Sequence, residues 1–163
     1  MGPDLAAAAA VHQLVVRRET LATAESLTGG LVAAIVVEIP GVSSVYRGGL
    51  VAYATELKHD LAYVPAELLA ERGPVDPDVA SALAEGARRR CGADWGVATT
   101  GVAGPDPQDG KPVGLVYVAV AGPFGVEVRE MRLEGNRKAI RTETVTRALL
   151  LLNDCLTDAP TPV

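Results

Sequence analysis

Short apolar runs alternate along the chain with segments of helical periodicity, and this alternation restricts the possible fold more than any other feature. Helices interleaved with strands predict an α/β layer fold, and a hairpin near the end makes the sheet mixed rather than purely parallel. Strand-like runs cover residues 21–24, 50–54, 95–100, 115–121 and 126–133. Helical patterns cover residues 5–18, 31–39, a segment from 56, 65–71, 77–91 and 137–156.

Residues with strong positional preferences mark several of these boundaries. Asp76 and Pro77 are expected as the N-cap and the first residue of a helix that Gly92 ends. Thr55 is expected to cap the helix that follows it, because its hydroxyl can accept a hydrogen bond from a free N–H group of the first turn.

The second arm of the hairpin does not alternate cleanly between apolar and polar residues. Val128 and Met131 fall on opposite faces of a regular strand. This pattern predicts either a β-bulge or a strand that is covered on both faces.

The length of 163 residues suits one domain, and a chain of this size can bury a core without disulfides or metal. We expect a single domain over residues 1–157 and a tail, 158–163, that frays because its two prolines cannot continue a helix. Cys91 and Cys155 lie far apart without a CxxC partner. They are interpreted as small apolar residues rather than as a disulfide or a zinc site.

The charge and composition argue against whole classes of partner. A net charge of -5 with 4% aromatic residues disfavours general nucleic-acid binding, which uses a basic surface and stacking rings. The amino-terminal apolar run lacks a preceding basic region, and the later run 31–37 is too short to span a bilayer. We therefore expect a cytoplasmic protein that binds neither nucleic acid nor membranes.

Three stretches with hydroxyl or amine side chains, two of them glycine-rich, lie at the ends of expected strands. They are residues 24–30, 53–58 and 99–106. In an α/β sheet ligands gather at the carboxyl ends of the strands, so parallel strands would bring these stretches together in one crevice.

Ser26 is the candidate nucleophile of the first stretch. The backbone N–H groups of Thr28, Gly29 and Gly30 precede a helix there and could hold an anion or a developing oxyanion. The simpler interpretation, a helix cap followed by a glycine turn, is favoured on spacing alone.

A nucleophilic serine needs a base, and Lys58 is the best candidate. Burial could lower the pKa of its amine, whereas Glu56 would oppose that change. The alternative, a solvated lysine on a short helix, is favoured on the residues alone. His59 lacks a third member of a triad, and His12 is expected on the surface of the first helix.

Two further features could bind a phosphate. The segment 101–104 resembles a phosphate cradle but lacks the lysine and serine of a P-loop. Arg137 and Arg141 lie one helical turn apart near the start of the last helix, where they could hold a phosphate or could simply be solvated. Asp106 and Asp109 are interpreted as turn residues, so no metal site is expected.

Together these stretches resemble the CinA carboxy-terminal domain family, which contains the bacterial nicotinamide-nucleotide amidases. The likeness covers about residues 8–156. It is carried by the motifs TAESLTGG (23–30), GLVAY (49–53), Lys58, TGVAGPD (100–106), KPVG (111–114) and GNR (135–137). Departures from the family pattern include Leu27, Thr100, Asn136 and the pair at 107–108, but none involves Ser26 or Lys58.

The resemblance implies a three-layer α/β/α sandwich with a mixed, mostly parallel sheet of about five strands. It implies hydrolysis of nicotinamide mononucleotide to nicotinic acid mononucleotide and ammonia, with no metal or other cofactor. A homo-oligomer, a dimer or larger, is expected. Ser26 would be the nucleophile, Lys58 its base and Tyr53 a supporting residue. The expected substrate-binding residues are Thr28, Gly29, Gly30, Thr100, Gly101, Ala103, Gly104, Arg137 and Arg141.

Two other functions stay open from the sequence. The chain could be a nucleotide-binding module without turnover, with a role linked to competence. It could also be a Ser-Lys hydrolase of another small amide.

Overall fold

The computed structural model describes residues 1–163, and its centre is a five-stranded mixed sheet in the order β2-β1-β3-β4-β5. β1 pairs in parallel with β2 and β3, whereas β4 is antiparallel to both β3 and β5, so four strands share one direction. The elements are α1 (Pro3–Arg17), β1 (Leu21–Glu25), α2 (Leu31–Val37), a 3-10 turn (Val42–Ser44), β2 (Tyr46–Val51), α3 (Thr55–Ala62), α4 (Ala66–Arg72), α5 (Pro77–Cys91), β3 (Trp95–Gly101), β4 (Leu115–Gly122), β5 (Gly125–Arg132) and α6 (Arg137–Asp158).

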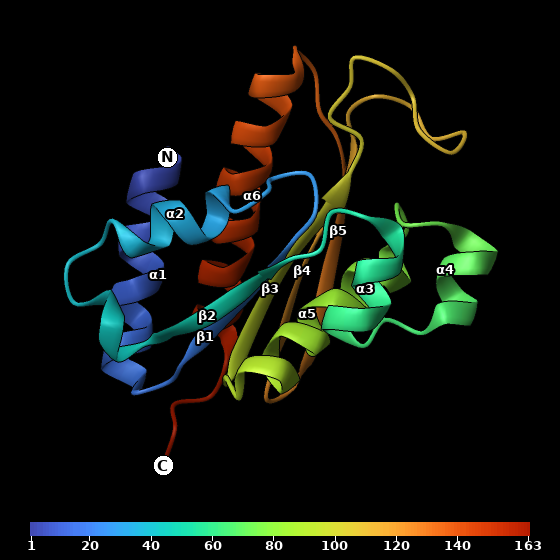
Figure 1. The fold of residues 1–163 in the computed structure, drawn as a ribbon. Coiled ribbons are helices and arrows are strands. Elements are labelled where there is room, and N and C mark those ends of the chain that lie inside the picture. The colour runs from blue at the N-terminus through green and yellow to red at the C-terminus, as the bar shows by residue number, and fades with distance from the viewer.

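Helices cover both faces of the sheet and make three layers (Figure 1). α1, α2 and α6 lie on one face, and α3, α4 and α5 lie on the other. Each face has its own apolar cluster, and β1 and β4 are buried at every position because both of their faces are covered. The expected α/β sandwich with a mixed sheet is therefore confirmed.

β2 occupies residues 46–51, so the expected strand at 50–54 begins four residues late and ends three residues late. The error comes from Gly48 and Gly49, which look like a turn that opens the strand. Gly49 instead lies inside β2, where a Cβ atom would overlap the hydroxyls of Thr23 and Tyr46. Those two hydroxyls form a hydrogen bond of 2.8 Å.

The cap predictions have mixed outcomes. Asp76 caps α5 as expected and accepts hydrogen bonds from the N–H groups of Asp78 and Val79 at 2.8 and 3.3 Å. Thr55 is not a cap, because α3 begins one residue earlier than expected and Thr55 is its first helical residue.

β5 contains no bulge and pairs with β4 residue for residue. Val128 packs against the apolar cluster on the α5 side, and Met131 packs against the cluster on the α6 side. The second of the two expected explanations holds only in part, because these two side chains pack on opposite faces but no residue of β5 is fully buried.

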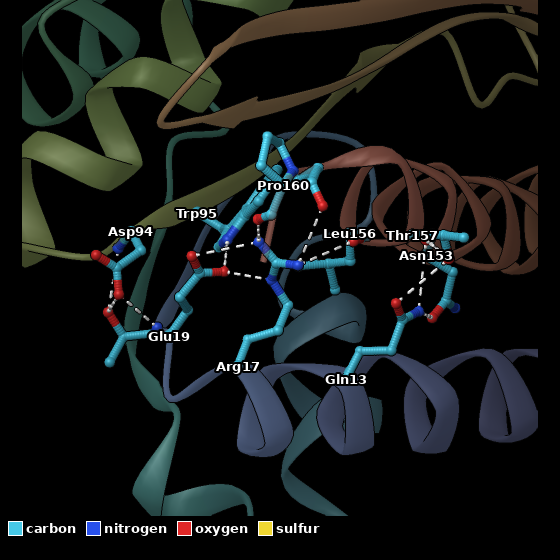
Figure 2. A network of polar contacts seen from close by, with 11 residues as sticks. Gln13, Arg17, Glu19, Asp94, Trp95, Asn153, Leu156, Thr157 and Pro160 are labelled. Carbon is cyan, nitrogen blue, oxygen red and sulfur yellow. Dashed lines mark hydrogen bonds and ion pairs between the residues drawn. The ribbon is translucent and has the colours of Figure 1, made fainter. Parts of the chain in front are cut away.

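A polar network joins α1, α6 and the starts of β1 and β3 at the end of the sheet where the chain terminates (Figures 1 and 2). Arg17 donates to the carboxylate of Glu19 at 2.7 Å, and Glu19 also accepts from the Trp95 indole at 2.7 Å. Arg17 further donates to the carbonyl of Pro160 at 2.7 Å and to that of Ala159 at 3.4 Å. The first residues after α6 are thereby bound to α1.

Gly86 allows α5 to contact the end of α3, because a Cβ atom there would overlap the carbonyl of Ala62. We expect Gly86→Ala to lower the free energy of unfolding by about 1–3 kcal/mol through this overlap, although alanine has the better helix propensity. Denaturant unfolding measures the change. Ser81→Ala on the same helix is the control and should stay within about 0.5 kcal/mol. A Gly86→Ala protein as stable as the parent would contradict this packing.

Candidate active site

The carboxyl ends of β1, β2 and β3 meet at one end of the sheet, where α6 begins (Figure 1). A cavity of about 360 Å³ lies there and is bordered by all three stretches that the sequence singled out. Its lining residues are Ser26, Leu27, Tyr53, Lys58, Pro74, Val75, Thr100, Gly101, Val102, Ala103, Gly104, Pro105, Asp106, Pro107, Gln108 and Arg137.

Ser26 and Lys58 are in direct contact inside this cavity. Ser26 follows the last residue of β1, and Lys58 lies on α3. Their Oγ and Nζ atoms are 3.0 Å apart. The Lys58 Nζ also donates to the backbone carbonyls of Ala52 at 2.8 Å and Tyr53 at 3.3 Å. Two residues separated by 32 positions in the chain thus form one hydrogen-bonded pair.

Lys58 is 1% exposed and forms no ion pair. Burial lowers the pKa of its amine to about 8 from the ordinary 10.5, and the charge of Glu56 opposes this shift only in part. About a tenth of Lys58 is therefore uncharged at pH 7, far more than for an ordinary lysine. Its burial excludes the solvated lysine that the sequence left open.

Glu25 is a buried carboxylate that the sequence analysis did not single out. It accepts hydrogen bonds from the N–H groups of Val32 and Ala33 at 2.8 and 3.1 Å and from the Thr28 hydroxyl at 2.6 Å. The protein's own carboxylate thus occupies the start of α2, which was expected to hold an anion. Strand alternation was the available signal, because it turns Glu25 toward α2 when Ser26 faces the cavity.

Thr28, Gly29 and Gly30 do not line the cavity. The Thr28 hydroxyl is bound to Glu25 and to the hydroxyl of Thr99 at 2.8 Å. The Gly29 N–H donates to the Ser26 carbonyl at 3.0 Å. These residues shape the turn that carries Ser26 rather than a surface that a substrate could reach.

The two arginines of α6 have different positions. Arg137 lines the mouth of the cavity and donates to the Tyr53 hydroxyl at 2.9 Å and to the Gly104 carbonyl at 2.6 Å. Arg141 does not line the cavity and instead donates to the carbonyls of Leu27 at 2.8 Å and Thr28 at 3.1 Å. The Tyr53 side chain therefore contacts Arg137, while its carbonyl contacts Lys58.

Thr100, Gly101, Ala103 and Gly104 all line the cavity, as expected for a ligand-binding loop. The Thr100 hydroxyl is already engaged, because it donates to the carbonyl of Pro74 at 2.7 Å. This bond joins the end of β3 to the segment before α5, whose Pro74 and Val75 form a wall that the sequence analysis missed.

The remaining candidates lie outside the cavity. His12 is exposed, and His59 contacts the carbonyl of Val64 rather than Ser26. No three or more His, Cys, Asp and Glu residues are grouped as metal ligands would be. No helix has both the length and the apolar character that crossing a membrane requires.

Comparison with known proteins places this geometry in a family. The description "CinA C-terminal domain" matches residues 4–156. A "CinA-like protein" of Frankia casuarinae is 50% identical over 147 residues, which cover 90% of this chain and 34% of that protein. A "Putative competence-damage inducible protein" of Desulforamulus reducens is 52% identical over 130 residues, covering 80% of this chain and 32% of that protein. The chain thus spans about a third of the length of these curated relatives.

Solved structures agree over the whole fold. The CinA superfamily protein from Klebsiella pneumoniae 700603 superposes with a TM-score of 0.93 at 29% identity, covering 98% of this chain and 100% of the other. The competence/damage inducible protein CihA from Agrobacterium tumefaciens superposes with a TM-score of 0.91 at 37% identity, covering 96% of each chain. The chain belongs to the CinA C-terminal domain family.

Proposed function

We propose that this chain is an amidohydrolase that converts nicotinamide mononucleotide to nicotinic acid mononucleotide and ammonia. The observation that carries the proposal is the contact of 3.0 Å between the Ser26 hydroxyl and the buried amine of Lys58. A hydroxyl beside an uncharged amine is the arrangement that activates a serine for attack on an acyl carbon.

The hydrogen bonds of Lys58 suit both of its protonation states. The charged amine can donate one N–H to each of its three contacts, Ser26 included, and the uncharged amine can turn its lone pair toward Ser26. An uncharged amine has two N–H groups and one lone pair. The carbonyls of Ala52 and Tyr53 can only accept, so they engage the two N–H groups. The third contact, to the Ser26 hydroxyl, is left for the lone pair.

The reaction uses this pair twice. Ser26 Oγ attacks the carboxamide carbon while Lys58 takes its proton, and the protonated amine then gives a proton to the departing ammonia. Water attacks the resulting ester with Lys58 again as the base, which releases the carboxylate and restores Ser26. Amides of the Ser26 turn or of the loop from Gly101 would stabilise the oxyanion.

The rest of the cavity suits a nucleotide that carries a flat ring and a phosphate. Leu27, Val75 and Val102 provide the cavity with apolar wall. Arg137 stands at the mouth, where its orientation is set by Tyr53 and Gly104, and a guanidinium binds phosphate well.

We expect Ser26→Ala and Lys58→Arg each to lower ammonia release from nicotinamide mononucleotide by about a thousandfold or more, because nucleophile and base act as a unit. An enzyme-coupled ammonia assay measures it. Ser43→Ala and Lys138→Arg change exposed residues outside the cavity and are the matched controls. Activity that survives both cavity substitutions would contradict the assignment, and turnover of only phosphate-free amides would indicate a different substrate.

The reaction rate should rise with pH because only the uncharged amine of Lys58 can accept a proton. With the pKa of Lys58 lowered to about 8, log kcat/KM should increase by about one per pH unit below pH 8 and level off above it. Initial rates between pH 6 and pH 9 provide the profile. A rate that is flat from pH 6 to pH 8 would show that no group with this pKa is the base.

The same pKa should be visible in stability without any substrate. Between about pH 8 and 10.5 the unfolded chain binds a proton at Lys58 that the folded chain does not, so the stability of the parent rises with pH relative to Lys58→Met. Between pH 7 and pH 10 the free energy of unfolding of the parent should rise by about 2–3 kcal/mol relative to that of Lys58→Met. Denaturant unfolding of both proteins at each pH measures these free energies. If their difference does not change with pH, the pKa of Lys58 is that of an ordinary lysine.

A further inference from the structure

Two neighbouring backbone N–H groups beside Ser26 have no hydrogen-bond partner within the protein. They belong to Leu27 and Thr28, and both residues are buried. A buried backbone N–H without a partner is rare because it costs free energy. These groups belong to the turn and not to the start of α2, whose N–H groups at Val32 and Ala33 are taken by Glu25.

Arg141 is linked to both free N–H groups through the peptide units of the turn. Its Nε donates to the Leu27 carbonyl at 2.8 Å, and that carbonyl shares a peptide unit with the Thr28 N–H. Its Nη2 donates to the Thr28 carbonyl at 3.1 Å, which shares a unit with the Gly29 N–H. The Gly29 N–H donates to the Ser26 carbonyl at 3.0 Å, which shares a unit with the Leu27 N–H.

Hydrogen bonds in such a chain polarise one another, and a charged donor at its head strengthens every N–H that follows. Arg141 forms no ion pair with any carboxylate, so its charge is not neutralised by a neighbouring side chain. The guanidinium also fixes the conformation of the turn from outside the cavity, because it donates to two consecutive carbonyls.

We propose that Arg141 is a positioning residue of the amidase reaction, which orders the turn and polarises its free N–H groups so that the Leu27 N–H, whose residue lines the cavity, binds the oxyanion. This rests on the proposed function and replaces the contact with substrate that the sequence suggested for Arg141. Donors of this kind act on the transition state and not on the bound substrate.

Arg137, four residues earlier on the same helix, provides the matched comparison because it lines the cavity. We expect Arg141→Lys and Arg141→Gln to lower kcat by about tenfold or more, below the ~100-fold cost of deleting an oxyanion donor, with KM changed less than about twofold. The loss should be equal for the mononucleotide and its phosphate-free riboside. Arg137→Lys should mainly raise KM, and only for the mononucleotide. A rise in KM limited to the phosphorylated substrate in the Arg141 variants would overturn the proposal.

A fluorophosphonate probe separates this proposal from the choice of substrate. Ser26 Oγ bonds to phosphorus, fluoride leaves, Lys58 takes the proton, and the phosphoryl oxygen occupies the oxyanion position. Intact mass gives the labelling rate, which should fall about tenfold in both Arg141 variants and stay near that of the parent in Lys138→Arg, an exposed position of the same helix outside the cavity. Equal rates in parent and Arg141 variants would refute the role of Arg141.

The combined outcomes are distinct. If the parent is labelled but releases no ammonia from the mononucleotide, the proposed substrate is wrong, and the labelling rates still decide the role of Arg141. If the parent is neither labelled nor active, Ser26 is not a nucleophile and both proposals fall. Thermal unfolding of each variant is measured in parallel, so that rates are compared between folded proteins.

Discussion

The burial of one amine without a counter-ion is the constraint on which the rest of this site depends. Lys58 can stay uncharged only where water and carboxylates are excluded, and two layers of the fold provide that exclusion. α3 packs against α5, with Gly86 of α5 at the end of α3, while the segment 52–53 supplies two carbonyls to the amine. The chemistry proposed for Ser26 therefore depends on the packing of the helix layer beside it.

Glu25, on the opposite face of the sheet, is a second buried ionisable group without an ion pair. A carboxylate buried without an ion pair is costly unless hydrogen bonds compensate it. Here two helical N–H groups and the Thr28 hydroxyl do so. Because α2 is thereby capped from within, it has no need of an external anion, and the free N–H groups nearest to Ser26 lie in the turn instead. The proposed oxyanion donor, the Leu27 N–H, therefore lies in the turn and not at the start of the helix.

The sequence predicted the layers of the fold and the cluster around Ser26 better than it predicted the details. Spacing alone left Lys58 more compatible with a solvated lysine, because burial is a property of the assembled layers and not of a short helix. The spacing also could not show that Arg137 and Arg141 have different roles. The two lie one turn apart on α6, and only Arg137 reaches the mouth of the cavity. β2 was misplaced because Gly49 serves a close side-chain contact that local turn preferences cannot reveal.

Strand alternation at the end of β1 explains why both faces of the sheet contribute to one site. Glu25 turns toward α2 and Ser26 turns toward α3, so one peptide unit joins a carboxylate in one layer to the proposed nucleophile in the other. A shift of this strand by one residue would exchange the two side chains and abolish both sets of contacts at once. Hydrogen-bonded pairing with β2 on one side and β3 on the other fixes the register of β1. This register fixes the positions of Glu25 and Ser26.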